Sequence, residues 1–477
     1  MNGRTKILAT IGPASRSPRV LRQLLDAGVN AFRLNFSHGT HEEHSAVVSD
    51  IRSLSREQDR HVAILQDLCG PKMRLNPLPG DVVDCNLDDE FTLVADATSS
   101  IERELSSTYR ALPNDVKVGE TVLFADGTVA MVVTDTAPDR ARLKVTLPGR
   151  LRSRQGINLP GSELSVRSLT DKDLQDLDWT ARHAGDVDFV GLSFVRTADD
   201  IALLRRELKS RNCPAHVVAK IEKPQAIDNL DEIVAAADAV MVARGDLGVE
   251  MDVQRVPALQ KRIIALCNRS HRPVITATQM LNSMEHSSRP TRAEASDVFN
   301  AVVDGADAVM LSGETAVGQY PVETVTTMRE ICTEAEGHLK SAKGHVALEA
   351  SPLSGFVEPI TKASVDGACL MAEQLDATLI VVAPGAGART ALAVSNRRPA
   401  AVILALSRTE RVARSFSLCW GVAPVVVPET LPAEHLLARG VEWARSHGMV
   451  ASGEHAVLLS QIVDRAGVWA VLAGPIP

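Results

Sequence analysis

The chain has few aromatic residues: Phe, Trp and Tyr make up 3% of its 477 positions. This scarcity argues against a surface that stacks nucleic-acid bases. The chain also lacks an excess of positive charge, since 51 basic residues face 59 acidic residues and the net charge is −8. A diffuse acidic balance makes nucleic acid an improbable main partner. We therefore expect small-molecule substrates and no nucleic-acid partner.

Long hydrophobic runs are absent as well. No stretch reaches the ~18 uninterrupted apolar residues of a membrane span, and the first apolar stretch is too short for a secretory signal. The seven cysteines are scattered, and none stands in a C-x-x-C pair. This usage predicts buried thiols in a reducing compartment, with no disulfides and no zinc site. We expect a cytoplasmic protein without a membrane partner.

What the chain does have is a repeated pattern of short apolar runs that end in polar residues. Helical segments with a period near 3.6 separate most of these runs, which predicts a parallel sheet. Eight such units indicate a closed (β/α)₈ TIM barrel. The eight runs are residues 6–10, 31–37, 62–67, 188–194, 216–222, 239–246, 273–279 and 308–314.

The barrel pattern is interrupted once and is followed by a different region. Residues 122–133 alternate around an Asp-Gly turn, which is a hairpin signal. We interpret the interruption, 71–160, as a small β-barrel lid domain inserted between two barrel segments, 1–70 and 161–345. The pattern restarts in 346–477, where strands and helices alternate again and predict a C-terminal α/β domain of a regulatory type.

Nearly every predicted barrel strand ends in a polar or charged group, and these ends share one rim of a barrel. Lys220 and Glu222 are two residues apart, so their side chains point to the same side of a strand. Asp246 closes the next strand, and with Glu222 it makes a plausible oxygen-ligand pair for Mg²⁺. Lys220 and Arg33 would supply positive charge for a phosphoryl group. This inventory favours phosphoryl transfer.

Eight segments, in this order, resemble the signatures of the pyruvate kinase family. They are RLNFSHG (33–39), DLCGPKMR (67–74), GINLPG (156–161), AKIEKP (219–224), MVARGDLGVE (241–250), TATQMLNSM (276–284), RPTRAEASDV (289–298) and MLSGETAVG (310–318). The three-domain layout is also similar to that of this family. The resemblance implies a glycolytic phosphotransferase that converts phosphoenolpyruvate and ADP to pyruvate and ATP, and that forms a homotetramer.

The same resemblance assigns roles to individual residues around the substrate. Arg33 would hold the phosphate, and Lys220 would stabilise the phosphoryl group in transit and the enolate left behind. Glu222 and Asp246 would bind one Mg²⁺. Thr278, with Glu314 nearby, would help to protonate the enolate. The substrate carboxylate would be received by a short run of backbone amides, which is Ala243, Arg244, Gly245 and Asp246.

Two further sites follow from the resemblance. Asn35, His38 and Arg74 would face the nucleotide phosphates, which bring a second Mg²⁺. In potassium-dependent relatives, side chains and one carbonyl bind K⁺ at the positions held here by Asn35, Ser37, Asp67 and Leu68.

This chain departs from those relatives beside the potassium site. It has Leu68 where they usually carry Thr, and Lys72 where they usually carry Glu. The ammonium of Lys72 can supply the charge that the monovalent ion would bring, so we predict activity without K⁺. The alternative is that Lys72 points to solvent and K⁺ still binds.

Other interpretations stay open at this point. The segment 383–391 places Gly385, Gly387 and Arg389 where relatives hold an effector phosphate, so it is either an anion site or a tight turn. The chain as a whole could also be a Mg²⁺-dependent lyase or aldolase that acts on pyruvate-derived substrates. A third possibility is a non-catalytic paralogue that binds metabolites.

Overall fold

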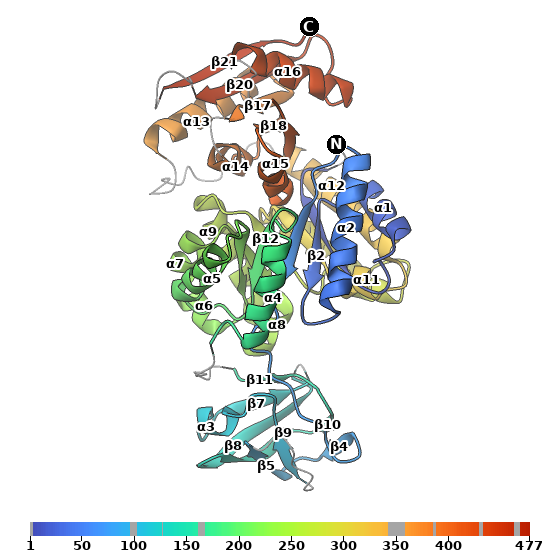
Figure 1. Ribbon diagram of the computed structural model, residues 1–477, viewed down its shortest axis with the longest axis vertical. Coiled ribbons are helices and arrows are strands. Elements are labelled where there is room, and N and C mark those ends of the chain that lie inside the picture. Colours follow the sequence, from blue (N-terminus) through green and yellow to red (C-terminus); the bar gives the residue numbers. More distant parts are fainter. Residues whose placement is uncertain are drawn as a thin grey trace.

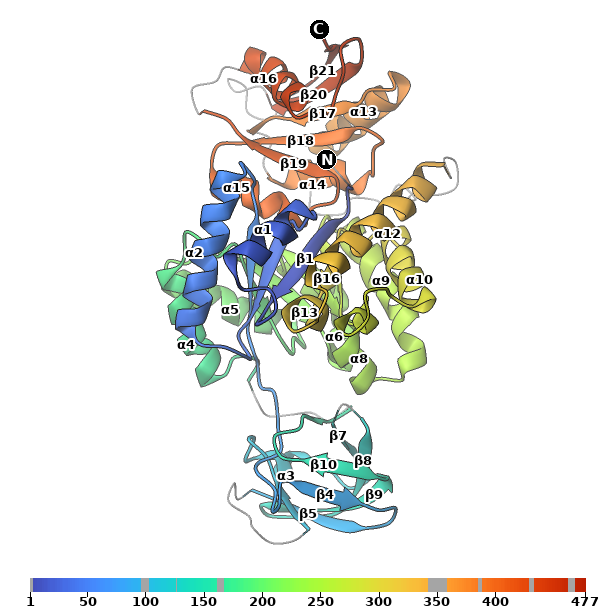
Figure 2. The same cartoon turned by 90° about the vertical axis from the view of Figure 1, so that its right-hand side faces the viewer.

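The computed structural model describes residues 3–95, 103–125, 127–160, 167–341, 358–384, 388–428, 433–461 and 468–477. The described parts form three bodies in a row (Figures 1 and 2). A barrel lies in the middle, the inserted domain projects from one end of it, and the C-terminal domain covers the other end.

Eight parallel strands close into the central barrel in the order β1-β16-β15-β14-β13-β12-β3-β2. Most of their residues are buried, as expected for strands with helices on the outside and packed side chains inside. The predicted TIM barrel is confirmed. The strands are β1 (Lys6–Ile11), β2 (Ala31–Asn35), β3 (Ala63–Asp67), β12 (Phe189–Leu192), β13 (His216–Ile221), β14 (Ala239–Ala243), β15 (Val274–Ala277) and β16 (Ala308–Leu311).

The helices around the barrel begin at recognisable caps. Thr40 and Glu43 form a capping box at α2, which satisfies backbone N–H groups that the first helical turn leaves free. Thr170 and Asp173 do the same at α4. The helices are α1 (Pro18–Asp26), α2 (His41–Glu57), α4 (Asp171–Arg182), α5 (Ala198–Ser210), α6 (Pro224–Asp228), α7 (Leu230–Ala236), α8 (Arg244–Glu250), α9 (Val256–Arg269), α10 (Arg292–Val303), α11 (Gly313–Ala316) and α12 (Pro321–Ser341). Short 3₁₀ turns are η1 (Val253–Arg255) and η2 (Asn282–Glu285).

The chain leaves the barrel after β3 and builds the inserted β domain around a separate hydrophobic core. A six-stranded, mostly antiparallel sheet has the order β11-β7-β8-β9-β5-β6, and β10 pairs with β4. The predicted hairpin is the β7–β8 pair. The elements are β4 (Val82–Cys85), β5 (Glu90–Val94), β6 (Glu104–Ser106), α3 (Leu112–Asp115), β7 (Thr121–Phe124), β8 (Val129–Ala137), β9 (Arg140–Leu147), β10 (Gly149–Arg152) and β11 (Ile157–Asn158).

The C-terminal domain is a five-stranded sheet in the order β19-β18-β17-β20-β21, and only the β20–β21 pair is antiparallel among the described pairs. This confirms the predicted α/β fold of the region. Its elements are α13 (Pro359–Gln374), β17 (Leu379–Val382), α14 (Ala388–Asn396), β18 (Val402–Ser407), α15 (Glu410–Ser415), η4 (Phe416–Leu418), β19 (Val422–Val426), α16 (Ala433–Ser446), β20 (His455–Gln461) and β21 (Trp469–Pro475).

The C-terminal domain also contributes to the interior of the barrel. Leu418 is fully buried and belongs to the cluster of inward-facing barrel residues that includes Leu8, Phe189 and Met241. We expect Leu418→Ala to lower the free energy of unfolding by ~2–5 kcal/mol, because it removes buried methyl groups and leaves a cavity. Urea unfolding measures this, with Leu472→Ala as an exposed control. A loss no larger than that of the control would show that the barrel does not depend on this contact.

Two predictions made from the composition, unpaired cysteines and no membrane-spanning segment, agree with the structure. All seven cysteines are unpaired, as expected. Among the described helices, none combines the length and the apolar character that a membrane crossing requires. The domain boundaries chosen from the sequence stay predictions, and those near residues 161 and 345 lie at or within segments outside the described residues.

Candidate active site

The side chain of Lys220 lies at the centre of the polar groups where the barrel strands end. Its Nζ is 2.8 Å from Glu222 Oε1 and 3.1 Å from Asp67 Oδ1, and it donates a hydrogen bond of 2.7 Å to Ser193 Oγ. Burial alone would lower the pKa of this ammonium, but the carboxylates of Asp67 and Glu222 outweigh it and raise the pKa. The two carboxylates therefore favour the charged form of the largely buried Lys220 ammonium.

Asp67 bridges the two cations that the sequence assigned to the phosphoryl group. Arg33 Nε donates to Asp67 Oδ2 at 2.7 Å, and an Nη of Arg33 donates to Thr10 Oγ1 at 3.1 Å. Burial would raise the pKa of Asp67, yet Lys220 and Arg33 overcome it and hold the pKa below its usual value. The ionised carboxylate of Asp67 thus keeps Arg33 and Lys220 on one side of the barrel mouth.

Glu222 and Asp246 provide the carboxylates predicted for Mg²⁺. Glu222 is 2% exposed, and its Oε2 accepts the Phe194 N–H at 2.9 Å. Burial and the nearby charge of Asp246 both raise the pKa of Glu222, although Lys220 opposes them. Two mutually repelling carboxylates at a strand end are a donor set that a divalent cation would stabilise. Among the described residues no group of three or more His, Cys, Asp or Glu side chains is placed to hold a metal ion, so substrate and water would complete the shell.

Thr278 lies beside the turn that follows β14. Its hydroxyl accepts the Gly245 N–H at 2.7 Å and donates to the Ala277 carbonyl at 2.6 Å. The backbone of Thr278 has φ 67°, a left-handed conformation that is strained for a β-branched residue. Arg244 supports this strained segment by donating to the Thr278 carbonyl at 2.7 Å and by pairing with Asp297 at 2.7 Å.

Glu314, which the sequence placed near Thr278, has other partners in the structure. Its two carboxylate oxygens accept the backbone N–H groups of Leu281 at 3.2 Å and Ser312 at 2.7 Å. Burial raises its pKa. The carboxylate of Glu314 therefore accepts hydrogen bonds from the backbone. Within the described structure, no hydrogen bond joins this carboxylate to the Thr278 hydroxyl.

The residues expected to face the nucleotide line the same end of the barrel. Burial and the positive charges of Arg74, Lys72 and Arg33 lower the pKa of His38, so its ring is neutral. Arg74 donates to the Arg154 carbonyl at 3.2 Å, at the base of the inserted domain. These cations create a positive region suited to phosphate oxygens.

Three of the four expected monovalent-cation ligands, Asn35, Asp67 and the Leu68 carbonyl, have other partners in the structure. Asn35 Oδ1 accepts the backbone N–H of Ser37 at 3.1 Å. Asp67 is paired with Arg33 and Lys220, as described above. The side chain of Lys72 is exposed.

Two contacts of this site were not anticipated from the sequence. Ser193 accepts from Lys220 and donates to the Leu68 carbonyl at 2.8 Å, while the Phe194 amide orients Glu222. Ser193 could have been found in the sequence, because it is a polar residue near the end of the apolar run 188–194. The amide of Phe194 gives no signal in the sequence, because any residue supplies a backbone N–H.

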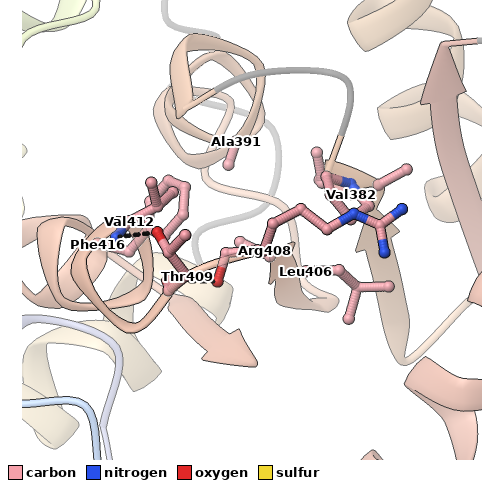
Figure 3. Close-up of a pocket in the computed structure, with 11 residues that line it drawn as sticks. Val382, Ala391, Leu406, Arg408, Thr409, Val412 and Phe416 are labelled. Carbon is pink, nitrogen blue, oxygen red and sulfur yellow. Dashed lines mark hydrogen bonds between the residues drawn. The ribbon is translucent and has the colours of Figure 1, made fainter. Parts of the chain in front are cut away.

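A pocket in the C-terminal domain lies between the ends of β17 and β18 and the start of α15 (Figure 3). Val382, Leu406 and Phe416 give it apolar walls, and Thr409 accepts the Val412 N–H at 3.3 Å at one side. The predicted anion-site residues Gly385 and Gly387 lie outside the described residues, so that prediction stays open.

The sequence matches two family models, which define the class of protein that this fold and site represent. Residues 2–325 match the pyruvate kinase barrel domain, and residues 362–467 match the pyruvate kinase alpha/beta domain.

Individual relatives show the same similarity. Pyruvate kinases from Staphylococcus aureus strains MRSA252 and USA300 are each 39% identical over 461 residues, which is 96% of this chain and 78% of each relative. The crystal structure of a pyruvate kinase from Cryptosporidium parvum has a TM-score of 0.93 and 32% identity, with 100% of this chain and 97% of that chain covered. The chain belongs to the pyruvate kinase family.

Family membership decides among the three functions that the sequence left open. The chain is an enzyme with pyruvate kinase activity, the glycolytic conversion of phosphoenolpyruvate and ADP to pyruvate and ATP. The lyase and the non-catalytic alternatives are thereby set aside. The family is generally dependent on Mg²⁺, in agreement with the carboxylate pair of Glu222 and Asp246.

Proposed function

We propose that Lys220, Arg33 and Thr278 carry out the phosphoryl transfer, with Mg²⁺ held by Glu222 and Asp246. The observation that carries this proposal is the convergence of Lys220 on Glu222 and Asp67, at 2.8 and 3.1 Å, at the mouth of the barrel. When bound there, Mg²⁺ supplies positive charge that stabilises the anionic oxygens of the substrate.

The chain's own groups position the phosphoenolpyruvate. Arg33 binds the phosphate, since Asp67 and Thr10 hold its guanidinium at the rim. The backbone amides from Ala243 to Asp246 bind the carboxylate, and the Gly245 amide exchanges its present bond to Thr278 for the substrate. Lys220 stabilises the charge that develops as the bond between phosphorus and oxygen breaks, because a fixed ammonium needs no reorganisation.

Thr278 helps to deliver the proton that converts the enolate to pyruvate. We expect Thr278→Val to reduce turnover by about 10²-fold, the usual contribution of a positioned proton donor. Thr278→Ser should recover most of the rate, because it restores the hydroxyl. Exchange of the pyruvate methyl protons with deuterated solvent isolates this step from phosphoryl transfer. Unchanged exchange in the Thr278→Val variant would remove Thr278 from the proton path.

The nucleotide binds across the surface lined by Asn35, His38 and Arg74, where Arg74, Lys72 and Arg33 supply positive charge, and ADP brings a second Mg²⁺. The neutral ring of His38 and the cation of Arg74 can donate hydrogen bonds to phosphate oxygens. We further propose a cytoplasmic homotetramer, in keeping with the absence of paired cysteines and with the family resemblance.

We propose that the activity does not require K⁺, because the exposed side chain of Lys72 can turn toward Asn35, Ser37, Asp67 and Leu68 and supply the positive charge there. In support of this, burial and the charge of Arg74 lower the pKa of His38, and the charge of Lys72 adds to that effect. Asp67 is also compensated by Arg33 and Lys220, so it does not need a monovalent ion for charge balance.

A coupled assay of pyruvate formation tests both the activity and its ion requirement. With phosphoenolpyruvate, ADP and Mg²⁺ in tetramethylammonium buffer, we expect full activity and less than a twofold increase on adding KCl. The variant Lys72→Glu should become strongly stimulated by KCl, since it replaces the local positive charge with a carboxylate. A large stimulation of the unmodified enzyme would contradict the role of Lys72.

A further inference from the structure

A buried ion pair lies just outside the proposed reaction centre. Lys223 Nζ is 2.7 Å from Glu250 Oε1, and the two side chains are 8% and 2% exposed. Lys223 directly follows Glu222 at the end of β13. Glu250 is the last residue of α8, the helix that also carries Asp246. The pair therefore ties together the two elements that bear the proposed Mg²⁺ ligands.

The inserted domain reaches the same ion pair through Asn158. This residue lies in β11, which pairs with β7, so its backbone belongs to the sheet of the inserted domain. Its Nδ2 donates to Glu250 Oε1 at 3.1 Å. Asn158, Glu250 and Lys223 thus form a continuous polar link from the inserted domain to the ends of β13 and α8.

The second oxygen of Glu250 gives an independent indication that this link is more than packing. Glu250 Oε2 is buried and has no hydrogen-bond partner within the described part of the chain. A buried carboxylate oxygen without a partner is unfavourable, and a buried ion pair is weak evidence for stability in itself. These contacts are better explained as a link that fixes the position of β11 relative to α8.

We propose that Asn158, Glu250 and Lys223 form the pivot that sets the position of the inserted domain over the barrel mouth. All three are positioning residues and touch no reacting atom. The inference rests on the proposed function, because the pivot acts on Glu222 and Asp246. The pivot has two separable effects. Asn158 controls the position of the inserted domain relative to the bound nucleotide. The Lys223–Glu250 pair controls the placement of the Glu222 and Asp246 carboxylates.

Kinetics and metal binding distinguish these two effects. We expect Asn158→Leu to raise the KM for ADP by about fivefold or more, within the usual range of coupling between sites, and to leave the affinity for Mn²⁺ alone unchanged. Glu250→Gln should also weaken Mn²⁺ binding by about fivefold or more, because Lys223, which lies over the ring of Phe194, then loses its carboxylate partner, and the Phe194 amide holds Glu222. Electron paramagnetic resonance of free Mn²⁺ reports that affinity without turnover.

Small-angle X-ray scattering supplies a structural measurement. The full-length enzyme should contract when ADP and Mg²⁺ are added, and Asn158→Leu should reduce this contraction. Asn114→Leu is a matched control, because Asn114 also donates to a carboxylate, that of Asp139 at 2.9 Å, but within the inserted domain. It should behave as the unmodified enzyme does.

A double variant distinguishes loss of the pivot contact from a general destabilisation of the protein. Asn158→Asp combined with Glu250→Gln keeps one amide and one carboxylate at the pivot with their roles exchanged, so that positions 158 and 250 can again form a hydrogen bond. We expect this variant to recover most of the ADP affinity that either single change loses. The pivot is wrong if Asn158→Leu matches Asn114→Leu in KM and in scattering, or if the double variant is no better than the single variants. Absence of pyruvate formation by the unmodified enzyme would instead contradict the proposed function.

Discussion

Replacing Lys220 by Met should lower turnover by about 10³-fold and leave phosphoenolpyruvate binding nearly intact. The physical reason is that the ammonium, held by Glu222, Asp67 and Ser193, acts mainly on charge that appears in the transition state. Binding is retained because Arg33 and the amides near Gly245 still hold the ground-state substrate. Stopped-flow or steady-state assays give kcat, and calorimetry gives the binding constant.

The control for this prediction is Lys261→Met. Lys261 lies in α9 and forms an ion pair with Asp304, and its side chain is 61% exposed. It should keep its turnover. If Lys220→Met retained more than a tenth of the activity, Lys220 would have no part in stabilising the transferred group.

Asp67→Asn should damage both activity and stability. The change leaves Arg33 and Lys220, both largely buried, without their shared counter-charge. Loss of one partner from a buried ion pair commonly costs ~3–5 kcal/mol. We expect the free energy of unfolding to fall by about that amount, with turnover reduced by about 10²-fold because the two cations separate. Urea unfolding and the coupled assay measure the two effects.

Asp67 also makes the free energy of unfolding dependent on pH. Its pKa is lowered in the folded protein, so its contribution is present above the unfolded pKa and is lost as the pH falls through the folded value. Asp178→Asn is the matched control, because Asp178 pairs with Arg211 at 2.7 Å on the surface and such pairs contribute ~0–1 kcal/mol. Equal losses in the two variants would show that Asp67 is not the central counter-charge.

Much of the barrel and of its site could be predicted because both depend on local patterns. Eight apolar runs with helices between them require a parallel sheet, and parallel strands place their ends on one rim. The spacing of Lys220 and Glu222 was therefore enough to predict that their side chains share one side of the strand, in agreement with the 2.8 Å ion pair between them. Family motifs added residue roles that spacing alone could not assign.

The remaining features depend on contacts between distant segments, and these leave no local pattern. Asp67 on β3 joins Arg33 on β2 to Lys220 on β13, and Asn158 meets Glu250 across 92 positions. Leu418 enters the barrel from another domain and looks like any apolar residue in the sequence. Glu314 was expected near Thr278, and its contact with the backbone N–H group of Leu281 likewise joins segments that no local pattern connects.

The central claim is that Lys220, Glu222 and Asp246 surround one divalent ion at the barrel mouth. Anomalous scattering from Mn²⁺ in crystals of the enzyme tests it most directly. A peak within coordination distance of carboxylate oxygens of both Glu222 and Asp246, lost in the Glu222→Gln variant, is the predicted result. A peak elsewhere in the protein, or one that persists in that variant, would contradict the account.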